Sequence, residues 1–232
     1  MNIEQLASRA PKTVPSRILG HYDSPLAAPA SRAFARPGRL ALLINRMIDI
    51  AISALLLVVL MVPMLLIAVL VKLTSRGPAM YRQERIGLGG KPFTILKFRT
   101  MRADAEGTTG PVWARRGDPR RTSLGILLRR LSLDELPQLF NILRGDMSLV
   151  GPRPERPFFV QVFSREYPAY NQRHQVLPGI TGWAQINGWR GDTSLEKRLE
   201  CDLYYIRHWS VLFNLRILLL TPLKVFVDRN AC

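Results

Sequence analysis

The uncharged stretch from Ile50 to Val71 limits what this chain can fold into more than any other feature. As an α-helix, these residues would extend for roughly 33 Å, which is enough to cross the hydrocarbon core of a bilayer, about 30 Å thick. A plain transmembrane helix is therefore the simplest interpretation of the stretch.

Two features favour a re-entrant helix over a full span. Pro63 lies near the middle of the stretch, where proline removes a helix hydrogen bond and clashes with the carbonyl four residues earlier. Both flanks are basic, so a full span would leave one positive flank on the outer side of the membrane. We therefore expect the helix to enter the membrane, break near Pro63 and return to the same side. The basic residues before the stretch are Arg32, Arg36, Arg39 and Arg46, and those after it are Lys72, Arg76, Arg82 and Arg85.

The charge of the chain is unusual. It has 33 Lys and Arg residues against 17 Asp and Glu, a net charge of +16, which indicates a polyanionic partner such as nucleic acid, an anionic lipid surface or a phosphorylated substrate. Two cysteines, Cys201 and Cys232, argue against a disulfide framework and fit a reducing compartment. The three histidines have no zinc-site spacing, so any metal should be a hard cation held by carboxylates.

The segment after the apolar stretch reads as a β-hairpin from Met80 to Met101, with a Gly-rich turn at residues 87–90. In its second strand, Lys97 and Arg99 fall on one face by the two-residue period. That face could meet a phosphate, or it could be an exposed basic edge that discourages aggregation. Residues 104–121 are polar and aperiodic and predict a loop.

Helical patterns account for most of the remaining chain. We expect a helix at residues 122–130 and a surface helix at residues 161–175 that Pro168 interrupts. A capping box of Thr193 and Glu196 opens another helix, whose apolar face should be core. Residues 211–227 are apolar but contain Arg216, Pro222 and Lys224, which is typical of a helix at the membrane surface. The prediction is an α+β fold, mainly helical, with a re-entrant membrane helix, a small β-hairpin and interfacial amphipathic helices.

The densest motif runs from Leu131 to Gln138 and continues through Gly145 to Glu155. Two adjacent carboxylates, Asp134 and Glu135, lie between the upstream cations Arg129 and Arg130 and a Gly/Pro-rich loop that carries Arg153. This grouping suits a phosphate substrate. Proline is tolerated only in the first turn of a helix, so Pro137 places Asp134 at or near the N-cap. The purely structural alternative is a capping box in which Glu135 pairs with Ser132.

The run SLDELPQLFNILRGDMSLVGPRPE resembles the signature of the bacterial sugar transferases, the monotopic polyprenyl-phosphate phosphoglycosyl transferases. The similarity extends from about Asn45 to about Val225 and includes KFRTM (residues 97–101) and PGITGWAQINGWRG (residues 178–191). The resemblance implies the same re-entrant helix. Val62 differs from the serine that the family often has before this proline, and a serine hydroxyl could satisfy a backbone group freed at the bend.

The resemblance also implies an activity and its location. The donor would be a UDP-sugar, with UDP-glucose or UDP-galactose favoured, and the acceptor would be undecaprenyl phosphate. In this scheme Asp134 attacks the sugar-bearing phosphorus, UMP leaves, and the lipid phosphate then takes the sugar phosphate from the aspartate. This would be the first membrane step of exopolysaccharide or glycoconjugate synthesis, at the cytoplasmic face of the bacterial inner membrane.

By the same resemblance, Asp134 and Glu135 are the catalytic dyad, Arg129 and Arg153 bind phosphate, and Asp134 binds Mg²⁺. Two further candidates for substrate binding have structural alternatives. Lys97 could be a strand-edge charge, and Asp146 could order the loop that leads to Pro154.

We expect the chain to consist of four parts, and the resemblance implies that it is a minimal catalytic form of its family. Membrane lipids are expected partners and nucleic acid is not, while a homo-oligomer is compatible with the sequence. The parts are a flexible basic tail at residues 1–38, the re-entrant membrane helix at 39–79, a catalytic domain at 80–200 and C-terminal interfacial helices at 201–232.

Two other function classes stay open from the sequence. A basic membrane-anchored protein that binds nucleic acid or lipid would explain the charge but not the dense carboxylate motif. A membrane-bound phosphodiesterase would hydrolyse the sugar nucleotide without needing a lipid acceptor.

Overall fold

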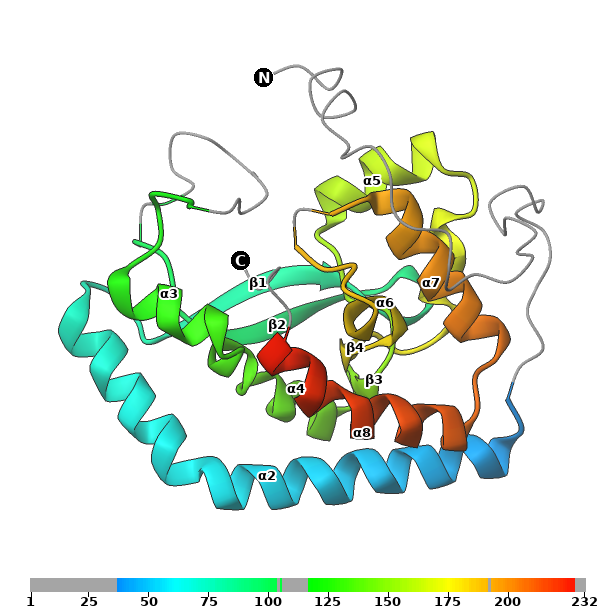
Figure 1. The fold of residues 1–232 in the computed structure, drawn as a ribbon, viewed down its shortest axis with the longest axis horizontal. Helices are drawn as coiled ribbons and strands as arrows, with labels where there is room; N and C mark the ends of the chain where they lie inside the picture. The colour runs from blue at the N-terminus through cyan, green and yellow to red at the C-terminus, as the bar shows by residue number, and fades with distance from the viewer. Residues whose placement is uncertain (1–36, 104, 106–116, 192, 228–232) are drawn as a thin grey trace.

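The computed structural model describes residues 37–103, 105, 117–191 and 193–227. The expected tail at residues 1–38 lies almost wholly outside these ranges, as does most of the expected loop at residues 104–121. Within them the fold is α+β and mainly helical, as predicted, and one long helix runs along one side of the molecule (Figure 1).

That helix, α2, spans Arg39–Thr74 and contains the whole uncharged stretch. It is long and apolar enough to cross a membrane, and 11% of its most apolar 18-residue window is buried. Large side chains such as Leu55, Val58 and Leu65 are more than 60% exposed. A surface of this kind suits lipid as its surroundings.

The helix continues through Pro63, so the expected break takes the form of a bend within one helix. Figure 1 shows this bend in the second half of α2, the half that contains Pro63. Helices α3 (Ser123–Arg130) and α4 (Gln138–Arg144) lie on the inner side of the bend (Figure 1). Proline bends a helix because it removes a backbone donor and displaces the preceding turn.

Two arginines attach α2 to the rest of the molecule. Arg46 of α2 donates to the carbonyls of Ile142 (2.6 Å) and Leu143 (2.9 Å) at the end of a second helix, α4. Arg99, which follows the hairpin, donates to two backbone carbonyls just beyond the end of α2, those of Ser75 (2.8 Å) and Arg76. Each guanidinium therefore binds backbone carbonyls in or just beyond the last turn of a helix, where intrahelical donors run out.

The predicted hairpin is confirmed. Strands β1 (Met80–Ile86) and β2 (Pro92–Phe98) pair antiparallel around a short 3₁₀ turn, η2 (Leu88–Gly90). A second sheet, which the sequence did not indicate, pairs β3 (Ser148–Val150) with β4 (Gly179–Thr181) in parallel.

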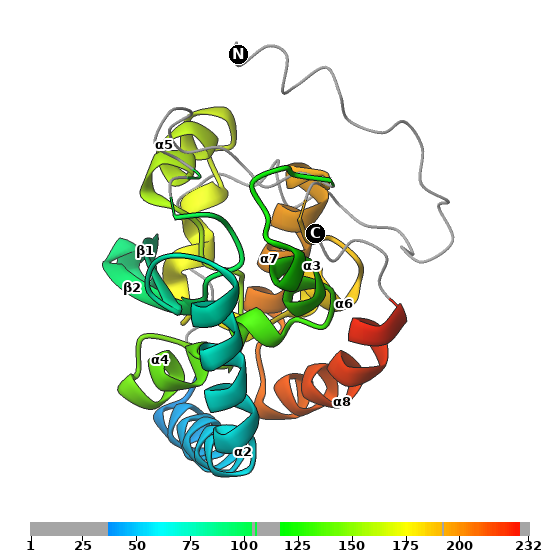
Figure 2. The ribbon, with the colours of Figure 1, turned by 90° about the vertical axis from the view of Figure 1, so that its left-hand side faces the viewer.

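The helical elements surround these strands. Figures 1 and 2 show α4 and α8 beside α2, with α5 at the opposite side of the molecule. Helix α7 continues across residue 200, where we expected the catalytic domain to end. The elements are α3 (Ser123–Arg130), η3 (Leu133–Glu135), α4 (Gln138–Arg144), α5 (Pro157–Glu166), η4 (Tyr170–Gln175), α6 (Trp183–Ile186), α7 (Leu195–Arg207) and α8 (Val211–Val227).

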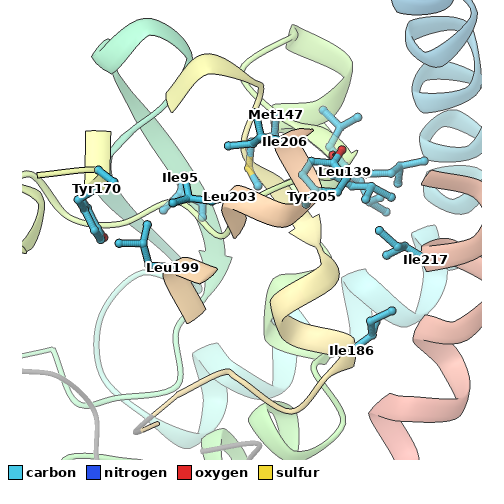
Figure 3. Close-up of a cluster of buried hydrophobic side chains, with 14 residues drawn as sticks. Ile95, Leu139, Met147, Tyr170, Ile186, Leu199, Leu203, Tyr205, Ile206 and Ile217 are labelled. Atoms are coloured by element: carbon cyan, nitrogen blue, oxygen red, sulfur yellow. The ribbon is translucent and has the colours of Figure 1, made fainter. Parts of the chain in front are cut away.

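The main core forms where α7 crosses the hairpin and α4 (Figure 3). Leu199, Leu203 and Ile206 of α7 are buried there, as their helical spacing predicted. Figure 3 shows them among side chains from β2, α4 and α8, including Ile95, Leu139 and Ile217.

Two local predictions are wrong. Helix α7 begins after Ser194, whose hydroxyl accepts from the Lys197 amide (3.3 Å), so Ser194 replaces Thr193 as the cap. The expected surface helix is interrupted near Pro168, as predicted, because α5 ends at Glu166, but the part after Pro168 is a 3₁₀ segment in which Tyr170 and Arg173 are buried. Burial of Arg173 is tolerated because its guanidinium donates to Asp202 (2.7 Å) and to the Tyr170 hydroxyl (2.6 Å).

Candidate active site

A cluster of charged side chains lines a cavity of about 380 Å³ between the hairpin, α3, η3 and the start of α7. Nine of the lining side chains are cations and three are carboxylates, so the cavity is strongly positive and suits a polyanionic ligand. The cations are Arg85, Lys97, Arg99, Arg102, Arg129, Arg153, Arg156, Arg190 and Arg198, and the carboxylates are Asp134, Glu135 and Glu155.

The dyad is placed in the cavity by a sharp turn after α3. Ser132 has a φ of 56°, in the left-handed region, which costs a non-glycine residue on the order of 1 kcal/mol. The turn separates η3, which carries Asp134 and Glu135, from the end of α3. Asp134 is therefore not the N-cap of α4, because Pro137 occupies that position.

The capping box between Ser132 and Glu135 does not form. The Ser132 side chain makes no cap bond to η3, and the Glu135 carboxylate is bound by cations instead. Lys97 donates to it at 3.0 Å, and Arg153 forms a two-pronged ion pair with it, with one contact at 3.0 Å. Burial alone would raise the pKa of Glu135, but Arg153 and Lys97 outweigh burial and hold that pKa well below its ordinary value.

The pKa of Asp134 is shifted in the opposite direction. Its side chain is buried, with 6% of the residue exposed, and burial followed by the adjacent charge of Glu135 raises its pKa. Lys97, Arg129 and Arg153 partly oppose this rise. Among the described residues, none donates a hydrogen bond to the Asp134 carboxylate. A buried, unengaged carboxylate with a raised pKa in a cationic cavity has the properties of a nucleophile.

Arg129 is held at the cavity wall by a residue that we did not single out from the sequence. Its Nε donates to the Thr100 hydroxyl at 2.8 Å, and Thr100 is 5% exposed. The Thr100 carbonyl accepts from the Thr122 amide (3.0 Å) at the start of α3. The motif KFRTM contains Thr100, so the signal was present, but its contact with Arg129 depends on the packing of α3 against the hairpin.

A second ionic group on the cavity wall was also not predicted. Glu155 accepts from Arg85 (2.9 Å) and lies 3.9 Å from Arg198. Burial raises the pKa of Glu155, but Arg85 and then Arg198 outweigh it, so the pKa is lowered. This group fixes the position of the loop that carries Arg153.

The structure brings together five of the six candidate residues: Lys97, Arg129, Asp134, Glu135 and Arg153 all line the cavity. Asp146 does not line it. Its carboxylate accepts from Asn141 (3.1 Å), whose side chain also bonds the backbone of β2. This position favours a structural role for Asp146, which braces α4 against the hairpin; ordering of the loop that leads to Pro154 was the structural role expected from the sequence.

A resident metal has no ready site here. The described residues include no group of three or more His, Cys, Asp or Glu side chains that could hold one. Of the three carboxylates that line the described part of the cavity, Asp134 is the one whose oxygens accept no hydrogen bond from the described residues. Mg²⁺ is commonly held by one or two carboxylates together with substrate phosphates. The donor set therefore fits a Mg²⁺ ion that binds together with a phosphate-containing substrate.

A family model described as bacterial sugar transferase matches residues 40–228 of the chain. The UDP-glucose:undecaprenyl-phosphate glucose-1-phosphate transferase of Escherichia coli (strain K12) is 47% identical over 193 residues, which are 82% of this chain and 41% of that protein. A protein of the same name from Caulobacter vibrioides is 46% identical over 192 residues, 81% of this chain and 71% of that protein.

A relative from Aeromonas hydrophila carries a different sugar in its name. This UDP-N-acetylgalactosamine-undecaprenyl-phosphate N-acetylgalactosaminephosphotransferase is 48% identical over 160 residues, 68% of this chain and 38% of that protein. The chain thus spans about two fifths of the length of several relatives that it matches.

Proposed function

Because this chain belongs to the bacterial sugar transferase family, we propose that it transfers a sugar 1-phosphate from a UDP-sugar to undecaprenyl phosphate and releases UMP. The observation that carries this proposal is the contrast within the dyad. Glu135 is neutralised by Lys97 and Arg153, whereas Asp134 is buried beside them with its carboxylate unengaged. Only one of the two carboxylates is thus available to attack phosphorus.

In the first step, an oxygen of Asp134 attacks the β-phosphorus of the donor. The bond between that phosphorus and the oxygen bridging to the α-phosphate breaks, UMP leaves, and a sugar-phosphoryl aspartate remains. In the second step, a phosphate oxygen of the lipid attacks the same phosphorus, and the aspartyl–phosphorus bond breaks. The carboxylate is restored and the product is a polyprenyl diphosphate sugar.

Both steps bring one anion to another, so the cavity must neutralise charge. Lys97, Arg129 and Arg153 provide fixed positive charge beside Asp134. Asp134 and the donor phosphates would hold Mg²⁺, which would neutralise further charge on the phosphate oxygens. Burial of the dyad limits water, which would otherwise hydrolyse the phosphoryl aspartate.

We further propose that α2 is re-entrant and keeps the cavity at the cytoplasmic face of the inner membrane. Its bend, its exposed apolar surface and the basic residues at both ends support this arrangement. The cavity then lies where a soluble sugar nucleotide and a membrane-bound carrier can meet.

The sugar is proposed as glucose or galactose, in the first membrane step of exopolysaccharide or glycoconjugate synthesis. Relatives named for glucose and for N-acetylgalactosamine have nearly the same identity to this chain, 47% and 48%, so identity does not choose between them. A panel of UDP-sugars assayed by UMP release identifies the donor.

The central test is transfer of label from a UDP-sugar with ³²P at the β-phosphate, without acceptor. The wild-type protein should retain the label covalently, and Asp134→Asn should not. Glu84→Gln serves as the matched control, because Glu84 is an exposed carboxylate of β1 outside the cavity. Absence of label on the wild type, or turnover by Asp134→Asn, defeats the proposal. Sugar phosphate released into solution without acceptor identifies a phosphodiesterase instead.

A further inference from the structure

Helix α3 has apolar side chains on its outer side as well as on its inner side. Leu124 and Leu128 face inward and pack in a cluster with Met64 and Val71 of α2. Ile126, Leu127 and Leu131 remain 50%, 51% and 40% exposed. Leu127 and Leu131 are four residues apart and lie on one side of the helix, whereas Ile126 lies about 100° from Leu127 around the axis. We call these three side chains, the exposed apolar ones of α3 and its C-cap, the outer face of α3. Large exposed apolar side chains that are close together mark a surface that binds something apolar.

The outer face of α3 continues the apolar surface of α2. Because Leu124 and Leu128 pack on α2, the two helices lie side by side, as the two ribbon views also show (Figures 1 and 2). The adjoining half of α2 has exposed apolar side chains of its own, among them Leu65, Leu66 and Leu70. An apolar ligand that lies in the membrane against α2 can therefore pass to α3 without leaving an apolar surface.

The other end of the outer face of α3 leads to the dyad. Leu131 precedes Asp134 by three residues, so their Cα atoms are at most about 11 Å apart. On the same helix, Arg129 lines the cavity. Arg130 is exposed and follows Ile126 by four residues, which places it beside the outer face. Cations next to apolar side chains match a ligand with an anionic head and an apolar tail.

We propose that the outer face of α3 binds the polyprenyl chain of the lipid phosphate and leads its phosphate to Asp134, an inference that rests on the transferase function proposed above. The isoprene units next to the phosphate are covalently attached to it, so they must leave the cavity over a surface near Asp134. α3 packs with the membrane helix and contributes Arg129 to the cavity; β2 also does both, with Phe98 and Lys97, but α3 adds exposed apolar side chains beside them. This position favours the carrier over a bulk phospholipid, which has no reason to approach the dyad.

The test is the double variant Ile126→Gln/Leu127→Gln, in which glutamine keeps helix propensity and removes the apolar surface. Its matched control is Leu88→Gln/Phe158→Gln, which changes two apolar side chains of similar exposure, 47% and 50%, in the hairpin turn and in α5. Each protein is assayed with undecaprenyl phosphate and with a short two-isoprene phosphate. The same proteins are tested for β-³²P labelling from the donor alone and for binding to phosphatidylglycerol vesicles that contain no polyprenyl phosphate.

For the α3 variant, we expect KM for undecaprenyl phosphate to rise about tenfold, since two half-exposed apolar side chains lose their burial by the ligand. Labelling from the donor, KM for the donor, the rate with the short acceptor and vesicle binding should match the control variant. These results together support the inference.

Three results of the acceptor and vesicle assays overturn it. The first is an unchanged KM for undecaprenyl phosphate. The second is an equal loss of activity with the short and the long acceptor. The third is a loss of vesicle binding that accounts for the whole rise in KM, which would assign the face to bulk lipid. Loss of labelling in the α3 variant alone would also overturn it, because the face would then act on the donor step. Failure of the transferase proposal is distinguishable, because in that case the wild-type protein does not become labelled.

Discussion

Glu135 sets the basicity of the neighbouring carboxylate, although it is not expected to react itself. Its negative charge is the second cause, after burial, of the raised pKa of Asp134. It also holds Lys97 and Arg153, which would otherwise act more strongly on Asp134. The two carboxylates therefore have opposite pKa shifts because one of them takes the cations.

Glu135→Gln should lower the pKa of Asp134, because the substitution removes a neighbouring negative charge and frees two cations. Attack requires the ionised carboxylate, so activity is lost as pH falls through this pKa. The acid limb of the pH dependence of kcat/KM for the donor step should therefore move to lower pH. The maximal rate should fall by about one to two orders of magnitude because Lys97 and Arg153 lose their anchor. An acid limb that stays in place or moves to higher pH contradicts this account.

Thr100→Val should raise KM for the donor about fivefold, because it keeps the shape of the side chain but removes the hydrogen bond to Arg129. Thr100→Ser restores the hydroxyl and should restore KM. Steady-state kinetics of UMP release measure both. If the serine variant behaves like the valine variant, Thr100 acts through packing and not through Arg129.

For single residues, the sequence predicts which residues form the site better than it predicts which residues they contact. Asp134, Glu135 and Arg153 belong to one continuous motif, so a short segment of chain brings them together. The contact between Thr100 and Arg129 joins residues 29 positions apart and depends on tertiary packing. Glu135 binds Lys97 and Arg153 instead of the expected Ser132 because tertiary packing brings these two cations to its carboxylate.

Helix α3 is fixed to the hairpin by a glycine. A Cβ atom at Gly125 would lie 2.1 Å from the Thr100 carbonyl oxygen, closer than any side chain can approach a backbone atom. The close approach allows Thr100 to reach Arg129 on the following turn of the helix.

Gly125→Ala should therefore displace α3 and lower the free energy of unfolding by about 1 to 3 kcal/mol. Activity should fall further than stability alone explains, because Arg129 moves with the helix. Thermal unfolding in detergent and UMP release measure the two effects. Gly38→Ala is the control, since a Cβ at Gly38 meets nothing within 4 Å. Equal unfolding midpoints for the two variants would show that the backbone contact has no such role.

The sequence predicts the longer elements and misses the short ones. The hairpin and the core face of α7 follow from period-2 and period-3.6 patterns. The sheet of β3 and β4 has three-residue strands, and all three residues of β3 are buried, so no alternation marks it. Its pairing depends on Gly151 and Gly179, because a Cβ at Gly179 would lie 2.1 Å from the Gly151 nitrogen. Contacts of this kind are specified by the partner segment and not by the local pattern.

For the whole molecule, the uncharged stretch identifies the membrane segment, but the sequence does not indicate how that segment is held. The anchoring by Arg46 and Arg99 joins residues that are far apart in the chain. Hydropathy therefore predicts that a helix meets lipid, whereas the position of the cavity relative to the helix requires the structure.

The proposed re-entrant arrangement predicts that both ends of α2 lie on the cytoplasmic side. Single cysteines at Gly38 and Arg76, in a protein with Cys201→Ser and Cys232→Ser, should be protected from a membrane-impermeant thiol reagent in intact cells. Both should react in inverted membrane vesicles. Both positions are exposed in the structure, so the reagent can reach them. Reaction of only one position from outside would establish a full span.

The two arginine attachments of α2 have a consequence for how the enzyme meets bilayers of different thickness. Arg46 binds near one end of the helix and Arg99 at the other, on either side of the bend, so the helix cannot tilt without moving the cavity. In the re-entrant arrangement proposed above, the position of Asp134 relative to the lipid head groups is then a fixed property of the protein. In a thicker or thinner membrane, the surrounding lipids would deform to match the helix, and the proposed nucleophile would keep its distance from the phosphate of the proposed lipid acceptor.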